Sequence, residues 1–99
     1  MITTNATWND DGLCIPGFGN AAFNNTLRGF GDSLAFTVDG TEAVGVHFYR
    51  NEIISTGDDT LEADYAHRNL SFYDNRAHNA ATLLSLDPLY GGPLLAARN

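Results

Sequence analysis

Short stretches of alternating apolar and polar residues recur along the chain. The alternation is clearest in residues 46–51, 70–75 and 94–99, and each of these stretches ends in asparagine. A period of two residues places successive side chains on opposite faces of a β-strand. Glycine, asparagine and aspartate lie between the stretches, as tight turns with positive φ require. The pattern predicts an all-β chain of short strands and turns.

The stretches also repeat at a fixed distance. They align without gaps at a spacing of 24 residues, and a weaker copy precedes them at residues 21–27. A second aligned column contains Leu13, Leu34, Leu61 and Leu83. Both columns advance by 21 to 27 residues per step, which is typical of stacked structural units whose connecting loops vary in length. We expect the repeats to begin near residues 9, 20, 45, 69 and 93.

Repeats of this size must stack, because a unit of about 24 residues cannot bury its own apolar face. Stacking with the strands in parallel gives a β-solenoid, and 99 residues provide about four rungs. We expect Phe48 and Phe72 to face the interior, and His47, Tyr49 and Tyr73 to face outward. The predicted core consists of Leu13, Ile15, Leu27, Leu34, Phe36, Val46, Phe48, Ile53, Leu61, Leu70, Phe72 and Leu83.

Asparagine occupies one position of the repeat, at Asn25, Asn51, Asn75 and Asn99. At the same corner of every rung, an asparagine amide group can donate to the side-chain carbonyl of the next asparagine while it also bonds local backbone. Asparagine tolerates the left-handed turn conformation as well. We therefore predict an asparagine ladder with a structural role and no catalytic one.

These features resemble the right-handed parallel β-helix proteins of the pectin lyase-like superfamily, whose stacked rungs carry an internal asparagine ladder. The resemblance rests on residues 57–62, 69–75 and 88–93 and covers about residues 9–99. It implies a right-handed parallel β-helix, binding or processing of polysaccharides, and an extracellular location. Members include polysaccharide lyases, glycoside hydrolases, epimerases and phage tail-spike proteins.

Complete members of that superfamily usually have more rungs and a capped end, whereas this chain stops at Asn99, on the ladder position. We expect residues 1–99 to form one partial β-helix domain. It is either a segment of a longer solenoid or a short solenoid that covers its open ends by self-association, because exposed strand edges favour pairing with another chain.

Composition and charge restrict the partners. Twelve acidic and five basic side chains give a formal net charge of -7, which argues against binding to nucleic acid or to anionic membranes. No stretch approaches the roughly 18 apolar residues of a membrane span, and the N-terminus shows no export signal. The single cysteine, Cys14, cannot form an internal disulfide, and its spacing from the histidines does not favour a zinc site.

Four acidic residues gather at Asp58, Asp59, Glu62 and Asp64. On a strand, Glu62 and Asp64 point to the same face, roughly 6.5 to 7 Å apart at the backbone. Paired carboxylates with a separation of that order serve as acid and base in inverting glycoside hydrolysis. The turn Gly57-Asp58-Asp59 also resembles the paired acids of the polygalacturonase-like branch. These four residues are the candidate catalytic group.

A structural role is the alternative for the acidic residues. Asp11, Asp32 and Asp59 fall in one column of the repeat, where they can accept backbone N–H bonds at a corner. Stacked carboxylates repel one another and favour a raised pKa or a bound cation, for which calcium is the natural choice. The sequence implies no other cofactor. A lyase of this type also needs a basic residue near the cation, and the local candidates are Arg68, Arg50 and His67.

Tyrosines on successive rungs form a second candidate site. Tyr49 and Tyr73 share an outward face with His47, and exposed aromatic rings can form a platform for sugars. The candidate substrate-binding residues are His47, Tyr49, Arg68 and Tyr73. Ordinary packing between rungs is the alternative. Two functions remain open, a carbohydrate-binding or carbohydrate-processing module and a non-enzymatic structural, adhesion or assembly module.

Overall fold

The computed structural model describes residues 2–3, 11–36, 42–88 and 90–99. These residues form β-strands and no helix, so they contain no helix that could span a membrane. The repeat start expected near residue 9 lies outside the described residues. The strands are β1 (Ile2–Thr3), β2 (Leu13–Cys14), β3 (Gly17–Phe18), β4 (Ala21–Phe23), β5 (Thr26–Arg28), β6 (Leu34–Ala35), β7 (Ala43–Val44), β8 (His47–Tyr49), β9 (Glu52–Glu62), β10 (Leu70–Tyr73), β11 (Arg76–Ser85) and β12 (Leu94–Ala97).

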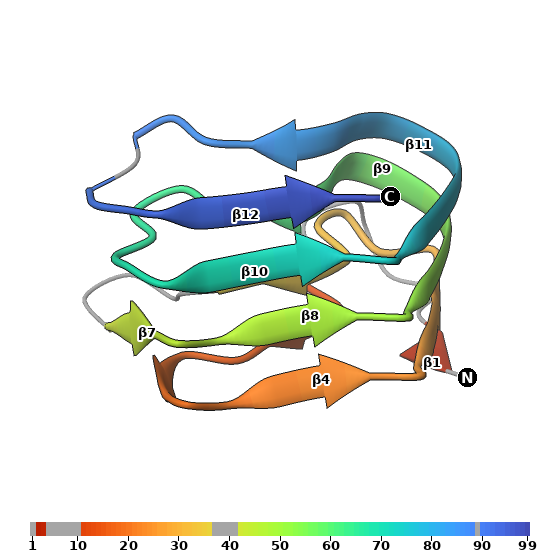
Figure 1. The fold of residues 1–99 in the computed structure, drawn as a ribbon. Coiled ribbons are helices and arrows are strands. Elements are labelled where there is room, and N and C mark those ends of the chain that lie inside the picture. The colour runs from red at the N-terminus through yellow and green to blue at the C-terminus, as the bar shows by residue number, and fades with distance from the viewer. Residues whose placement is uncertain (1, 4–10, 37–41, 89) are drawn as a thin grey trace.

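Strands that lie one repeat apart pair in parallel. One sheet has the order β12-β10-β8-β4, and a second has the order β1-β5-β9-β6-β2 with β11 paired to β9. A short third sheet contains β3 and β7. In Figure 1 the strands of the first sheet run to the right, and the chain returns behind them to the left at the next level, so the winding is right-handed. The predicted parallel β-helix is confirmed, with about three turns in place of about four rungs.

The predicted faces of the strands are confirmed. Phe48 and Phe72 are fully buried, and so is Leu70, two residues before Phe72 on the same face of β10. The alternate residues of β8 and β10 are only partly buried. Leu13 and Ile15 are partly buried and pack against the core. The remaining buried members of the predicted core are Leu27, Leu34, Phe36, Val46, Ile53, Leu61 and Leu70.

The prediction of the core is wrong for one residue, Leu83. Its side chain is 47% exposed, and Leu84 instead pairs with Leu61 and packs against the core. The register of β11 against β9 shifts between Ala80 and Thr82. Because side chains alternate between faces, a shift of one residue moves the neighbouring leucine inward and turns the predicted one outward.

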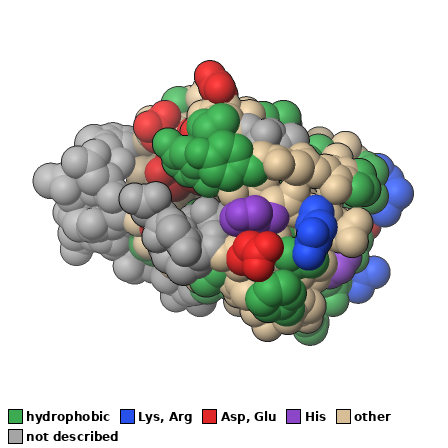
Figure 2. Space-filling view, turned by 90° about the vertical axis from the view of Figure 1, so that its left-hand side faces the viewer, with side chains coloured by type: hydrophobic (Ala, Val, Ile, Leu, Met, Phe, Trp, Pro, Cys, Tyr) green, Lys and Arg blue, Asp and Glu red, His purple; other side chains and the backbone are tan. Residues whose placement is uncertain are grey.

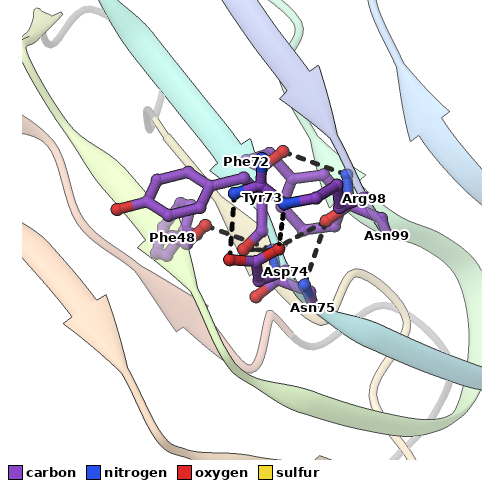
Figure 3. Close-up of polar contacts among 7 residues, drawn as sticks. All are labelled: Phe48, Phe72, Tyr73, Asp74, Asn75, Arg98 and Asn99. Carbon is purple, nitrogen blue, oxygen red and sulfur yellow. Dashed lines mark hydrogen bonds and ion pairs between the residues drawn. The ribbon is translucent and has the colours of Figure 1, made fainter.

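The asparagine ladder is present as predicted. Each side-chain Nδ2 donates to the Oδ1 of the next asparagine, at 3.1 Å from Asn25 to Asn51, 3.0 Å from Asn51 to Asn75 and 3.0 Å from Asn75 to Asn99. Asn51 and Asn75 are only 2% exposed. Figure 3 shows the upper part of the ladder, where the Asn75 amide also donates to the carbonyl oxygen of Phe48. The ladder therefore joins successive rungs through side chains and backbone together.

The corners of the rungs repeat one backbone conformation. The residue directly before each ladder asparagine has a φ of 54° to 59°, in the left-handed region where non-glycine residues are uncommon. The same conformation recurs at two further corners, which keeps successive rungs in register. The three columns are Gly19, Gly45 and Asn69, then Asn24, Arg50, Asp74 and Arg98, and finally Gly29, Ser55 and Asn79.

Candidate functional site

Acidic residues from two successive rungs meet on the second sheet. Asp58 and Asp59 lie within β9, and Asp32 lies in the turn before β6. The N–H of Asp58 donates to the Gly31 carbonyl at 2.9 Å and the N–H of Ser33 donates to the Asp59 carbonyl at 3.0 Å, so the two segments run side by side. Carboxylate oxygens of Asp32, Asp58 and Asp59 consequently all lie within 4.8 Å of one another.

Asp32 accepts a hydrogen bond from the backbone of the neighbouring rung, which is the structural role expected for its column. Its Oδ1 accepts the N–H of Asp59 at 3.1 Å. Burial raises the pKa of the Asp32 carboxyl above its usual value and the surrounding negative charges add to the rise, while this hydrogen bond opposes it. Three carboxylates could contribute to a calcium site, but calcium takes six to eight oxygen ligands. The cluster alone does not define such a site.

Glu62 and Asp64 lie side by side where β9 ends. Burial is the largest cause of a raised pKa at Glu62. Together with hydrogen bonding to Asp64, the charge of Asp64 and hydrogen bonding to Asp59, it raises the pKa of this carboxyl to about 8. Asp64 is held in place, since its Oδ1 accepts the Ser85 hydroxyl at 2.8 Å and the Asp87 N–H at 2.7 Å. Glu62 therefore retains a proton at neutral pH, beside an Asp64 side chain that these two bonds hold in place.

The Glu62 and Asp64 side chains converge more closely than their backbone spacing implies. Their carboxyl groups are near enough to hydrogen bond, whereas inverting glycosidases separate their two carboxyl groups by roughly 6.5 to 9.5 Å to admit a water molecule. Two carboxyl groups this close can share one proton. A water molecule or a substrate oxygen would have to enter between the two groups during a reaction.

The outward tyrosines form a continuous stack of rings. The centroids of Phe23 and Tyr49 lie 4.8 Å apart with an interplanar angle of 10°, and those of Tyr49 and Tyr73 lie 5.1 Å apart at 5°. Each inner ring face is covered by the next ring, so a sugar can reach the ring edges and hydroxyl groups of this column. Phe23 was not among the predicted site residues, although its place in the weaker first repeat, two residues before Asn25, could have identified it.

The remaining predicted binding residues lie apart from one another. His47 begins β8 and Tyr49 ends it. Arg68 is exposed and lies just before the start of β10, where its backbone pairs with that of Val44. Tyr73 is the last residue of β10. The structure therefore places Arg68 and the tyrosine stack at opposite ends of the first sheet. Arg50 is the nearer cation, with its guanidinium carbon 6.0 Å from the Tyr49 ring centroid.

Comparison with known proteins adds no family to this description. No protein-family model matches the chain, and neither a curated protein nor a solved structure matches it. The parallel β-helix is thus established by the strand pairing itself.

Proposed function

We propose that this chain is a carbohydrate-binding or carbohydrate-processing β-helix module of the pectin lyase-like kind, extracellular as that resemblance implies. Its reactive group is the acidic cluster Asp58, Asp59, Glu62 and Asp64. The observation that carries the proposal is the raised pKa of Glu62, about 8, beside Asp64. Acid–base catalysis needs a group that is protonated at the working pH, and a carboxyl group whose pKa is raised supplies it.

The roles within the pair follow from their surroundings. Glu62 is the proton donor, because it is protonated below about pH 8 and can transfer that proton to a glycosidic oxygen as the bond breaks. Asp64 is the proton acceptor: it would take a proton from the water molecule that attacks the anomeric carbon as the glycosidic bond breaks. Both the Ser85 hydroxyl and the Asp87 N–H bond its Oδ1, so neither of these donors occupies its Oδ2. The substrate and this water molecule would have to separate the two carboxyl groups.

Replacement of Glu62 by glutamine tests this proposal. The purified protein is assayed for depolymerisation of polygalacturonate, alginate and neutral glycans, each with and without calcium. Glu62→Gln keeps the shape of the side chain and removes the transferable proton, so we expect activity to fall by about 100-fold or more. Glu52→Gln is the matched control, because it changes a half-exposed glutamate at the other end of β9. Full activity in the Glu62→Gln protein would exclude Glu62 as the proton donor.

The calcium arm of this assay bears on Asp32, Asp58 and Asp59. If their carboxylates hold calcium during the reaction, a chelator abolishes activity and Asp58→Asn weakens the calcium response. Activity that is unchanged by the chelator leaves proton transfer by Glu62 as the whole mechanism and assigns Asp32 to the corner hydrogen bond.

A non-enzymatic assembly module is the second candidate. Within the described residues, β4 and β12 are the outer strands of the first sheet, and each has one unpaired edge. Phe23 on β4 is 48% exposed and Leu95 on β12 is 55% exposed. Unpaired strand edges beside apolar side chains favour pairing with another chain, which supports self-association through the ends of the solenoid.

A further inference from the structure

Two connections between strands lie against each other beside the Glu62–Asp64 pair. They are residues 63–69, between β9 and β10, and the described residues 86–88 and 90–93, between β11 and β12. The N–H of Tyr65 donates to the Pro88 carbonyl at 2.6 Å, and the N–H of Tyr90 donates to the Ala66 carbonyl at 3.0 Å. Both connections lie on the left in Figure 1, on the side that faces the viewer in Figure 2.

The two tyrosines of these connections present open ring surface. Tyr65 is 46% exposed and Tyr90 is 64% exposed. Their ring centroids lie 5.5 Å apart at an interplanar angle of 62°, and the Tyr90 ring lies 6.4 Å from the ring of His67, also at 62°. An edge-to-face contact covers one face of one ring. Unlike the stack on the first sheet, this pair therefore keeps ring faces available to a ligand.

The backbone holds the aromatic pair in place. A Cβ atom added to Gly91, which follows Tyr90, would collide with the carbonyl oxygen of His67, so the two connections are in direct contact. Tyr65 has a φ of 60°, a conformation that is unusual for a bulky residue and persists only where its surroundings enforce it. Rings that are fixed before binding lose little conformational entropy when a ligand arrives.

The aromatic pair and the acidic pair belong to one surface. Asp64 directly precedes Tyr65, and its carboxylate accepts the N–H of Asp87 on the opposite connection at 2.7 Å. Figure 2 shows hydrophobic and acidic side chains next to one another on this side of the molecule. A pyranose ring offers C–H groups that pack on tyrosine faces and hydroxyl groups that donate to carboxylates, so both parts of the surface suit a sugar.

We infer that Tyr65 and Tyr90 form a saccharide-stacking subsite beside the Glu62–Asp64 pair, and that its ligand is a non-anionic glycan. The inference rests on the proposed function and names its substrate class. Charge determines the class, because the chain carries a net charge of -7 and Asp64, Asp59 and Asp32 lie near enough to Glu62 to raise its pKa. Acidic side chains repel the carboxylates of a uronate polymer, whereas they accept hydrogen bonds from neutral sugars and attract amino sugars.

Calorimetric titration tests the subsite. The full chain is titrated with galactomannan, xyloglucan, glycol chitosan and polygalacturonate, in the presence of a calcium chelator. We expect Tyr90→Ala to weaken the binding of the non-anionic glycans about tenfold, or about 1.4 kcal/mol, and Tyr90→Trp to restore it by retaining a flat ring. Phe18→Ala is the control, since Phe18 is 66% exposed on β3 and its loss should leave affinity unchanged. Circular dichroism verifies that each variant is folded.

The outcomes separate the subsite from the function. If the native chain binds a glycan and the Tyr65→Ala, Tyr90→Ala double variant binds it equally well, the subsite is wrong and the proposed function stands. Tighter binding of polygalacturonate than of the other polymers would overturn the substrate class. If no polymer binds to the native chain, the proposed function fails, and the subsite fails with it.

Discussion

Single asparagine side chains join the rungs of this solenoid. Asn51 donates from Nδ2 to the Ala22 carbonyl at 3.1 Å and to the Asn75 Oδ1 at 3.0 Å, and its own Oδ1 accepts the backbone and side-chain N–H groups of Asn25, each at 3.1 Å. A buried amide with all its partners contributes to stability, whereas the removal of one side chain leaves its partners unpaired.

We therefore expect Asn51→Ala to lower the free energy of unfolding by about 2 to 4 kcal/mol. Urea denaturation followed by circular dichroism measures the change. Asn20→Ala is the control, because the Asn20 side chain is exposed and makes one bond to the Pro16 carbonyl, and its replacement should cost less than about 0.5 kcal/mol. Equal losses in the two variants would contradict a structural ladder.

Individual site residues were only partly predictable from the sequence. Glu62 and Asp64 were found because their spacing on a strand places them together. The contact of Asp59 with Asp32 joins two members of one column of the repeat, so the sequence indicated it. The contact of Tyr65 with Tyr90 depends on two irregular connections, which follow no period, so the alternation of residue types cannot reveal it.

At the scale of elements, the period of two residues determined which strand faces are buried. The prediction succeeded for β8 and β10, which pair without a register shift from Ser71 opposite His47 to Tyr73 opposite Tyr49. It failed for Leu83 because the register of β11 shifts after Ala80, and such a bulge arises from packing between rungs, which a local pattern does not contain.

The buried rings of β8 and β10 give a prediction at this scale. Phe48 is fully buried and its centroid lies 4.9 Å from that of Phe36. We expect Phe48→Ala or Phe72→Ala to lower the free energy of unfolding by about 3 to 5 kcal/mol, because each leaves a cavity in the core. Thermal and urea denaturation measure the loss. Unchanged stability in either variant would show that the assignment of inward and outward faces is wrong.

For the whole molecule, the open question is how the outer strands are covered. The described residues leave one edge of β4 and one edge of β12 unpaired, and the net charge of -7 opposes the approach of a second copy. Screening of that charge by salt should favour contact between the ends.

We therefore expect the purified 99-residue chain to form oligomers whose average mass rises with protein concentration and with ionic strength. Multi-angle light scattering between low and moderate salt measures the mass. A monomeric mass under all these conditions would exclude the assembly module, and it would leave the carbohydrate-directed proposal unaffected.

The proposed function depends most on the proton held by Glu62. A carboxylic acid with a raised pKa stays protonated until the pH rises through that pKa, so Glu62 should lose its proton near pH 8, in place of its ordinary value of 4.5. Activity that requires this proton should then fall as the pH rises above about 8.

The most direct test is an NMR titration of the Glu62 side-chain carboxyl carbon from pH 3 to pH 10, with the signal assigned from the Glu62→Gln protein. We predict a midpoint near pH 8, which shifts toward the ordinary value of 4.5 when Asp64→Asn removes the neighbouring charge. A midpoint near 4.5 in the native chain would contradict the acid–base pair.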